Sequence, residues 1–501
     1  MIDLNEFETL AGEYNVIPLV TTILADMHTP VSTYLTFREE GVASFLFESV
    51  EPNEKVGRYS FVGFRPTITL RAKATGVEIR NGVSVETRQG NIFEALQQIS
   101  PRYRQAPLSE EGGFVGGFVG FLGYDTVRHL ESILLTPPGV QDTDDAVFGL
   151  FSSIVRFDHR RQLVTIIHNV LIDTSRSLQT QYEEGKKAIE TIELRLRKTT
   201  VAVSSFVCDP VPIEDGMGAS AYCDAVSRAK KYIVEGDIFQ VVLSRRTRFR
   251  YSGDLFQVYR ALRIINPSPY LFYVDFGDTK LVGSSPEVLV RVQEGVVEVL
   301  PIAGTRARGL TEAEDQWLEE ELLRDQKELA EHVMLVDLGR NDVGRVSEFG
   351  SVEVPVFARV ERYSHVMHIV SEVRGKMKSA ATSLDALQAC FPAGTVSGAP
   401  KVRAMEIISE LEGNRRGVYA GAVGYIGFDG AVDTCIAIRT IVAQHDTLTV
   451  QTGAGIVADS VPENEYRETV NKSRAMLEAL TLAAGGLSQP PESVGDRRRD
   501  G

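Results

Sequence analysis

The sequence has little of the material from which disulfide scaffolds, thiolate metal centres and membrane spans are built. Its four cysteines show no metal-ligand spacing: Cys208, Cys223, Cys390 and Cys435. No apolar run approaches the length that crosses a bilayer, and the acidic start MIDLNEFETL lacks the basic and apolar regions of a secretion signal. We therefore expect reduced, partly buried thiols in a cytoplasmic protein without a membrane-spanning segment.

Basic residues are also fewer than acidic residues, which gives the chain a net charge of -15. This balance argues against a surface for nucleic acid or anionic membrane, although arginine, lysine and a metal gathered locally can still hold an acidic substrate. With 501 residues, 43% hydrophobic and 24% charged, the composition is typical of a soluble globular protein with two to four domains. No internal repeat of solenoid period is present.

A nucleotide-binding loop is missing as well. The glycine-rich run GGFVGGFVGFLGY begins at Gly112, but the strand, helix start and later acidic residue that such a loop requires do not follow in order. We expect instead that bare backbone here lies close to another element.

The distribution of strands and turns predicts an α+β protein with two main parts. Residues 17–173 carry short apolar or alternating runs between turn residues. This pattern predicts an N-terminal α+β domain that spans residues 1–200. Prolines and glycines mark a linker over residues 199–218. Strands and helices then alternate through a second domain, residues 219–483, and residues 484–501 should form a disordered tail.

Acidic side chains are concentrated in KELAEHVMLVDLGRNDVGR, which begins at residue 327. Asp325 can cap a helix whose third position is Glu328, and Glu331 follows on the same face. Residues 339–342, GRND, predict a helix stop and a charged turn. The two glutamates are either a cap and a solvated side chain or ligands of a hard cation.

The spacing Glu-x-x-Glu recurs in a second stretch, DSVPENEYRE. Ser460 and Glu463 predict a capping box, after which Glu465 and Glu468 share one helix face with Lys472. Alone, these would be ordinary surface pairs. Two such turns could instead converge on one magnesium ion, which prefers one or two protein carboxylates. The ligands would then be Glu331 and Glu468, with Glu328 and Glu465 behind them.

Six motifs occur in one order: PIAGTR, KELAEHVMLVDLGRND, FPAGTVSGAPK, GAVGY, DTCIAIR and QTGAGIVADSVPENEYRET. Together they resemble the chorismate-utilising enzymes, and among these the anthranilate-forming branch. The resemblance covers residues 219–482 and, more weakly, residues 19–158. It implies the α+β fold of this family, also called aminodeoxychorismate synthase-like, in which large β-sheets carry helices on the outside.

The activity implied by this resemblance is that of a Mg²⁺-dependent lyase subunit. It would convert chorismate and ammonia into anthranilate and pyruvate, the first step of tryptophan biosynthesis, with tryptophan as feedback inhibitor. None of the four cysteines stands on the glycine-flanked elbow of a glutaminase, so a separate glutamine amidotransferase subunit would supply ammonia. The alternatives are a 2-amino-2-deoxyisochorismate or 4-amino-4-deoxychorismate synthase component, and a non-catalytic subunit that binds tryptophan or chorismate.

Two positions distinguish between the reactions of these relatives. Gln240 stands where the isochorismate-forming relatives carry a lysine that activates water, and an amide cannot act as that base. Ala303 stands where the aminodeoxychorismate-forming relatives carry a lysine able to bond to the ring. Both residues favour anthranilate as the product of the reaction.

The resemblance also assigns roles in the site. Glu287, in GSSPE, matches the proposed acid for the departing hydroxyl, and His368, in SHVMHIV, matches the histidine linked to pyruvate elimination. Residues matching substrate contacts are Thr305, Thr395, Tyr419, Arg439, Gly453, Gly455 and Lys472. From the residues alone, the favoured explanations are a loop carboxylate, a core histidine, a strand-end salt bridge and tight turns.

A regulatory site is implied where SFLFESVE meets NPSPYLF. The matching positions for the inhibitor tryptophan are Ser49, Asn266, Pro267, Tyr270, Leu271 and Phe272, next to Glu48. A strand end that packs on a proline turn would explain the same residues without a ligand.

Overall fold

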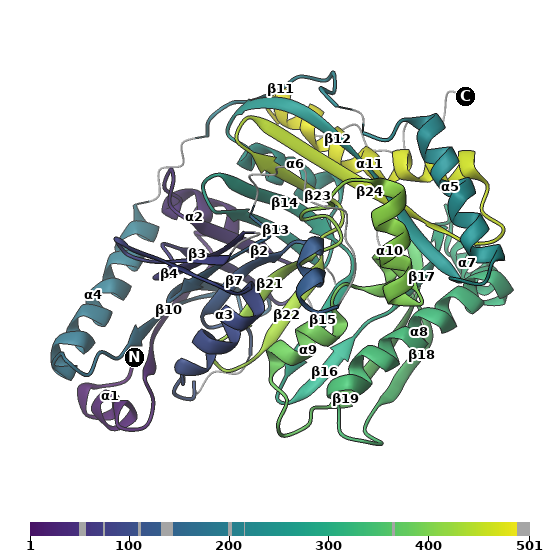
Figure 1. The fold of residues 1–501 in the computed structure, drawn as a ribbon. Coiled ribbons are helices and arrows are strands. Elements are labelled where there is room, and N and C mark those ends of the chain that lie inside the picture. The colour runs from purple at the N-terminus through teal and green to yellow at the C-terminus, as the bar shows by residue number, and fades with distance from the viewer. Residues whose placement is uncertain are drawn as a thin grey trace.

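A computed structural model of the chain describes residues 1–49, 57–73, 76–108, 112–131, 144–198, 203–214, 216–362 and 366–487. These residues form two large antiparallel sheets with helices on their outer faces (Figure 1), as predicted for the α+β class. Within the described ranges no helix is long and apolar enough to cross a membrane.

The first sheet joins twelve strands. In order they are β1 (Val16–Leu24), β10 (Leu163–Leu171), β9 (Ser153–Asp158), β3 (Tyr59–Phe64), β2 (Ser44–Glu48), β13 (Tyr270–Asp275), β14 (Thr279–Ser285), β23 (Thr440–Gln444), β24 (Thr447–Ile456), β12 (Gln240–Gly253) and β11 (Phe206–Cys208), with β20 (Gly398–Ala399) also on β12.

The second sheet also joins twelve strands. In order they are β17 (Ile302–Ala307), β19 (Val366–Lys376), β16 (Val296–Val299), β15 (Val288–Gln293), β22 (Val432–Ile436), β21 (Ala422–Gly427), β7 (Gly117–Leu122), β8 (Ala146–Phe151), β4 (Ile68–Lys73), β5 (Gly76–Asn81) and β6 (Ser84–Arg88), with β18 (Glu353–Arg362) also on β19.

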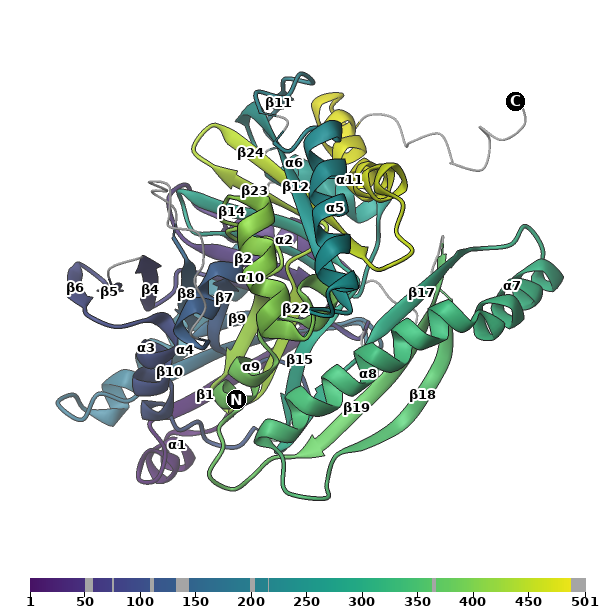
Figure 2. The same cartoon turned by 45° about the vertical axis from the view of Figure 1, so that its right-hand side comes forward.

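The helices cover the outer faces of both sheets. They are α1 (Leu4–Ala11), α2 (Pro30–Phe37), α3 (Ile92–Ile99), α4 (Leu178–Arg197), α5 (Ala219–Val234), α6 (Phe256–Ile265), α7 (Glu312–Arg324), α8 (Gln326–Val346), α9 (Ser383–Cys390), α10 (Lys401–Glu412) and α11 (Pro462–Ala484), with 3₁₀ turns η1 (Ser100–Arg102), η2 (Tyr124–His129) and η3 (Gly394–Val396). Figure 2 shows α8 lying along β17, β19 and β18.

Side chains alternate along the strands, so each sheet has one face toward the other sheet and one toward helices. On β13, Phe272 and Val274 pack between the two sheets, whereas Leu271 and Tyr273 pack under the helices. The core therefore has four layers: helices, sheet, sheet, helices.

Both sheets combine strands from the two parts of the chain. In the first sheet β2 pairs with β13, and in the second sheet β7 pairs with β21. The division proposed near residues 199–218 therefore separates two chain segments that share their sheets. The glycine-rich run provides part of β7, where a Cβ atom on Gly120 would collide with the carbonyl of Val147. The predicted close backbone approach is confirmed.

Helix α8 corrects one prediction. The helix runs through residues 339–342, where a stop was expected. A Cβ atom on Gly339 would lie 3.1 Å from a methyl group of Val299, so the glycine allows close packing on the sheet rather than ending the helix. Asp342 is buried and forms an ion pair with Lys401 rather than a surface turn.

Helix α11 begins at Pro462, but the predicted capping box is wrong. Val461 is the N-cap residue, without a side-chain cap, and the hydroxyl of Ser460 accepts a hydrogen bond from the amide of Val457 instead. The helix includes Ala484, and the predicted disordered tail lies outside the described residues from 488 onward.

Candidate active site

The first acidic turn is fixed by its cap and by one arginine. As predicted, Asp325 caps α8, accepting from the amides of Lys327 (3.0 Å) and Glu328 (3.3 Å). Arg306 of β17 donates to Glu328 (3.0 Å) and Asp325 (2.8 Å). The guanidinium thus compensates the charge of Glu328, which leaves the next acidic residue of the helix for another partner.

That next acidic residue is Glu331, which lies in a cluster of charged side chains. The side-chain amide of Gln240 donates a 3.0 Å hydrogen bond to its carboxylate. Burial raises the pKa of Glu331, and the negative charges of Glu328 and Glu468 raise it too, while Gln240 and Lys327 oppose the shift. The charge of Glu468 thus acts on Glu331 across the two acidic turns, and a shared ion at these two residues stays a prediction.

The second acidic turn is linked to β24 through a lysine. The ammonium of Lys472 lies 2.6 Å from a carboxylate oxygen of Glu468 and donates to the carbonyl of Gly453 at 3.0 Å. Burial raises the pKa of Glu465, and the charge of Glu468 adds to that effect. Lys472 therefore brings positive charge to the edge of the acidic cluster.

The donor set fits a hard divalent cation. In the part of the chain described, no group of three or more histidine, cysteine, aspartate or glutamate side chains is placed to hold a metal. Glu331 and Glu468 instead offer two carboxylates, the number that magnesium commonly takes from a protein before water and an anionic ligand complete its shell. Burial is the main cause of the raised pKa of Glu331, and the charges of Glu328 and Glu468 add to it, so a bound cation would favour the ionised carboxylate.

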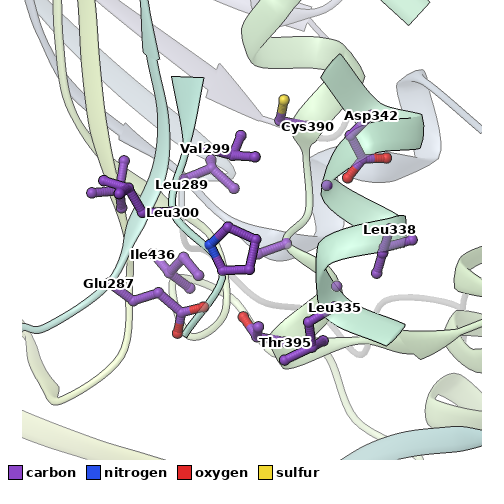
Figure 3. A pocket seen from close by; sticks show the side chains of 15 residues that line it. Glu287, Leu289, Val299, Leu300, Leu335, Leu338, Asp342, Cys390, Thr395 and Ile436 are labelled. Atoms are coloured by element: carbon purple, nitrogen blue, oxygen red, sulfur yellow. The ribbon is translucent and has the colours of Figure 1, made fainter. Parts of the chain in front are cut away.

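Glu287 lies where the chain crosses from β14 in the first sheet to β15 in the second. Burial raises its pKa to about 7, although the nearby Thr395 hydroxyl and the charges of Lys472 and Arg439 favour the ionised form. In Figure 3 the side chains of Glu287 and Thr395 point toward one another. At neutral pH the carboxyl is therefore protonated about half of the time.

His368, on β19, faces Thr305 across the ladder with β17. Its Nδ1 lies 3.0 Å from the carbonyl oxygen of Gly304 and 3.0 Å from the Thr305 hydroxyl. Since a carbonyl only accepts, Nδ1 carries the proton and Nε2 is the unprotonated nitrogen. Burial lowers the pKa of His368, so the ring is neutral near pH 7.

Arg439 occupies the second crossover between the sheets, from β22 to β23, in a left-handed backbone conformation with φ +50°. Burial lowers its pKa, opposed by Tyr419, Glu468 and Glu287. Among the described residues, its guanidinium makes no hydrogen bond or ion pair. A half-buried guanidinium without a hydrogen bond, held by a left-handed backbone, is typical of a ligand site.

Two glycines of β24 let side chains approach its backbone. A Cβ atom on Gly453 would lie 2.6 Å from the hydroxyl of Tyr419, and one on Gly455 would lie 2.8 Å from the amide nitrogen of Gln240. Glycine is needed at both positions because any side chain would displace these groups.

A family model described as chorismate binding enzyme matches residues 43–478. The chain belongs to this family. It is 45% identical to anthranilate synthase component 1 of Acetivibrio thermocellus over 96% of this chain and 98% of the relative, and 46% identical to that of Aquifex aeolicus over the same shares. Its fold matches the crystal structure of anthranilate synthase component I from Streptococcus pneumoniae with a TM-score of 0.74, at 35% identity over 91% of this chain and 99% of that one. The menaquinone-specific isochorismate synthase of Escherichia coli shares the fold, with a TM-score of 0.69 and 20% identity over 95% and 98% of the two chains.

The family resemblance inferred from the motifs and the predicted fold are both confirmed. In this chorismate-binding enzyme the sequence-predicted residues Glu331, Glu468, Lys472, Arg439 and Glu287 are electrostatic neighbours. His368 joins them because the charge of Arg439 acts on its pKa.

The residues predicted to bind an inhibitor gather at a second place, on the first sheet. Glu48 at the end of β2 pairs with Leu271 on β13, so the two predicted segments lie side by side. The Ser49 hydroxyl is buried and has no hydrogen-bond partner in the described ranges. Asn266 caps the C-terminus of α6, and its amide approaches the hydroxyl of Ser284 at 3.4 Å.

The other members of this group are held in different ways. Tyr270 donates to Asp433 (2.6 Å) and accepts from Arg291 (2.8 Å). Leu271 and Phe272 are core residues, and Pro267 is half-buried. Ser49 and Asn266 are thus the polar side chains with capacity left for a ligand, and the inhibitor site stays a prediction.

Sequence reasoning missed two structural roles. Arg306, in the motif PIAGTR, clamps the cap of α8, and Gln240 holds Glu331. Arg306 stood in a quoted motif and Gln240 had been singled out for the choice of nucleophile, but only the fold shows which groups they contact.

Proposed function

We propose that the chain is the chorismate-converting large subunit of an anthranilate synthase, acting in the cytoplasm with Mg²⁺. It would form anthranilate and pyruvate from chorismate and ammonia. The observation that carries the proposal is that the charge of Glu468 acts on both Glu331 and Arg439, although the three residues come from different elements of the fold. Near-full-length similarity to anthranilate synthase component 1 proteins supports it.

Substrate binding would use the charges of the site. Arg439 can hold one chorismate carboxylate with two parallel hydrogen bonds, and Lys472 adds a point charge. Mg²⁺ held by Glu331 and Glu468 would supply positive charge for a carboxylate of the substrate. Thr305, Thr395 and the β24 backbone at Gly453 and Gly455 would contact the ring and its side chain.

The first step is amination with loss of the ring hydroxyl. Glu287 with a pKa of about 7 can donate its proton to that hydroxyl, which leaves as water. Ammonia enters as the nucleophile, since the amide of Gln240 cannot deprotonate water and Ala303 cannot bond to the ring. The step therefore gives an aminated ring that still carries the enolpyruvyl group.

The second step eliminates pyruvate and makes the ring aromatic. With Nδ1 donating to Gly304, the Nε2 atom of His368 can take the ring proton. The resulting imidazolium is positioned by Gly304 and Thr305. A neutral, oriented imidazole is the form that this role requires.

Ammonia would come from a separate glutamine amidotransferase subunit. Burial raises the pKa of all four thiols, to about 11 for Cys208, so none is an activated nucleophile. Tryptophan would inhibit by binding near Ser49 and Asn266.

Purified chain with chorismate, Mg²⁺ and ammonium salt tests the proposal. We expect anthranilate fluorescence with ammonium and none with glutamine until the partner subunit is added. Chromatography separates the alternatives, because a 2-amino-2-deoxyisochorismate or 4-amino-4-deoxychorismate product without pyruvate would contradict the proposed reaction. Absence of any chorismate conversion would favour a non-catalytic binding subunit.

A further inference from the structure

A small cavity lies behind Glu287, between α8 and the strands β15 and β16. Its volume is about 40 Å³, and most of its lining is apolar, with Leu289, Val299 and Leu338 among the contributors. Figure 3 shows Glu287 and Thr395 on one side of this cavity and Asp342 with Cys390 on the other. The cavity thus connects the proposed acid to a second carboxylate.

That second carboxylate is incompletely satisfied. The side chain of Asp342 is 7% exposed, and one of its oxygens accepts from the ammonium of Lys401 at 2.7 Å. The other oxygen, Oδ1, is buried and has no hydrogen-bond partner in the described part of the chain. The Thr395 hydroxyl, on the opposite side of the cavity, lies close enough to Glu287 to favour its ionised form, but it makes no hydrogen bond of normal geometry within the described part of the chain. A buried polar atom left without a partner destabilises the folded chain, because it loses the hydrogen bond that water gives it in the unfolded chain, and the loss is larger when the atom is charged.

Bound water provides hydrogen bonds to these two unpartnered oxygen atoms. One water molecule needs about 10–15 Å³ of such volume and two or more polar partners, so a 40 Å³ cavity with three polar side chains at its ends can hold two or three. An entirely apolar cavity of this size would stay dry. Here the unpartnered oxygens of Asp342 and Thr395 provide the anchors.

We propose that this cavity is a hydration site whose waters, anchored by Asp342 Oδ1 and Thr395 Oγ1, reach the Glu287 carboxyl. Asp342 is then a positioning residue for the proposed acid, because it acts on Glu287 only through these waters. This role rests on the proposed function, whereas the hydration site itself does not. The waters stabilise the ionised form of Glu287, so they limit the rise of its pKa that burial causes.

The charges around both carboxyls fit this arrangement. Glu287 faces Lys472 on α11 and Arg439 between the sheets, and Tyr419 lies nearby. Asp342 faces Lys401 at the start of α10 and Arg345 on its own helix, with the Cys390 thiol close by. Because the Asp342–Lys401 pair is neutral overall, its effect on Glu287 is carried by bound water more than by net charge.

Two variants separate hydration from folding. Val299→Ile adds one methylene to the cavity lining and should displace a water, whereas Val292→Ile adds the same group on β15 away from the cavity. Asp342→Leu combined with Lys401→Met replaces the buried pair by apolar side chains, an exchange that proteins often tolerate. It removes the anchor without changing net charge.

The first measurement is a high-resolution crystal structure of the full chain. We expect ordered water within hydrogen-bond distance of Asp342 Oδ1 and Thr395 Oγ1, and a dry cavity would overturn the proposal. The second measurement is the pKa of Glu287. It is obtained by infrared titration of the carboxyl band that disappears in Glu287→Gln. Val299→Ile and the double variant should each raise the proton affinity of Glu287 about tenfold, and Val292→Ile should leave it unchanged.

The same shift should appear in activity. The basic limb of the pH profile for kcat should move to higher pH in Val299→Ile and in the double variant, which a purely structural role would not produce. An unchanged Glu287 titration in both would refute the inference. If the chain proves inactive on chorismate, the crystal structure and the infrared titration still test the hydration site. Failure of the proposed function can therefore be distinguished from failure of the hydration site.

Discussion

The side-chain amide of Gln240 donates a 3.0 Å hydrogen bond to the carboxylate of Glu331. One contact thus joins Gln240, from which the use of ammonia rather than water is inferred, to a proposed metal ligand. This hydrogen bond also favours the ionised form of Glu331, because it opposes the rise in pKa that burial causes.

Replacing Gln240 by Met should therefore weaken activation by magnesium. Without the hydrogen bond, the pKa of Glu331 rises further and more of the carboxylate is protonated, so the ion competes with a proton. We expect the Mg²⁺ concentration for half-maximal activity to rise about tenfold, and more below pH 7 than above it. Gln257→Met is the control, since its amide donates to Asp254 away from the site. An equal magnesium requirement in both variants would argue against this role.

The titration of Glu287 predicts a pH dependence of rate. The protonated carboxyl is the acid, so kcat should fall about tenfold per pH unit above its pKa of about 7. Glu287→Gln should lose more than about a hundredfold in rate at every pH. A profile that keeps its basic limb in this variant would assign the limb to another group.

The same group predicts a pH dependence of stability. Its pKa is raised from the ordinary 4.5 to about 7, so the native state binds the proton more tightly than the unfolded chain. This contribution is fully present below pH 4.5 and is lost as pH rises through 7. Between pH 5 and 8, Glu287→Gln should show a smaller fall in the free energy of unfolding than the unsubstituted chain, measured by urea denaturation.

Removing the imidazole of His368 should separate the two steps. His368→Ala keeps the acid and the charged residues, so amination should continue while pyruvate release falls at least about a hundredfold. Chromatography of the ring products with an enzymatic pyruvate assay measures both. His445→Asn, in a turn between β23 and β24, is the control. Parallel loss of both steps in His368→Ala would remove its assigned part in elimination.

The predicted inhibitor site can be tested at Ser49. Its hydroxyl is buried without a partner beside β13, so Ser49→Phe would fill the space that a ligand needs. We expect inhibition by tryptophan to weaken about a hundredfold while kcat stays near that of the unsubstituted chain. Ser49→Ala, which keeps the space, should retain most of the inhibition. Undiminished inhibition of the phenylalanine variant would place the regulatory site elsewhere.

The sequence supplied the candidate site residues but not how the chain brings them together. Capping by Asp325 is a local signal and was correct, because the bonds lie within four residues. The electrostatic coupling of Glu331 with Glu468 depends on two sheets that each mix strands from both parts of the chain. No local pattern encodes that mixing.

Local signals failed where tertiary packing overrode them. Gly339 resembled a helix stop, yet it lies inside α8 because a side chain there would crowd Val299. Ser460 resembled a helix cap, yet its hydroxyl accepts from Val457 and Val461 takes the cap position. The role proposed for Asp342 was equally hidden, since its sequence context predicted a solvated turn.

The central claim is that Glu331 and Glu468 hold one divalent ion for the substrate. The most direct measurement is binding of Mn²⁺, as a spectroscopic substitute for Mg²⁺, with chorismate present. We expect one ion per chain, at least about tenfold weaker binding in Glu331→Gln and in Glu468→Gln, and loss of turnover with unchanged thermal unfolding. Unaltered ion binding and activity in both variants would contradict the account.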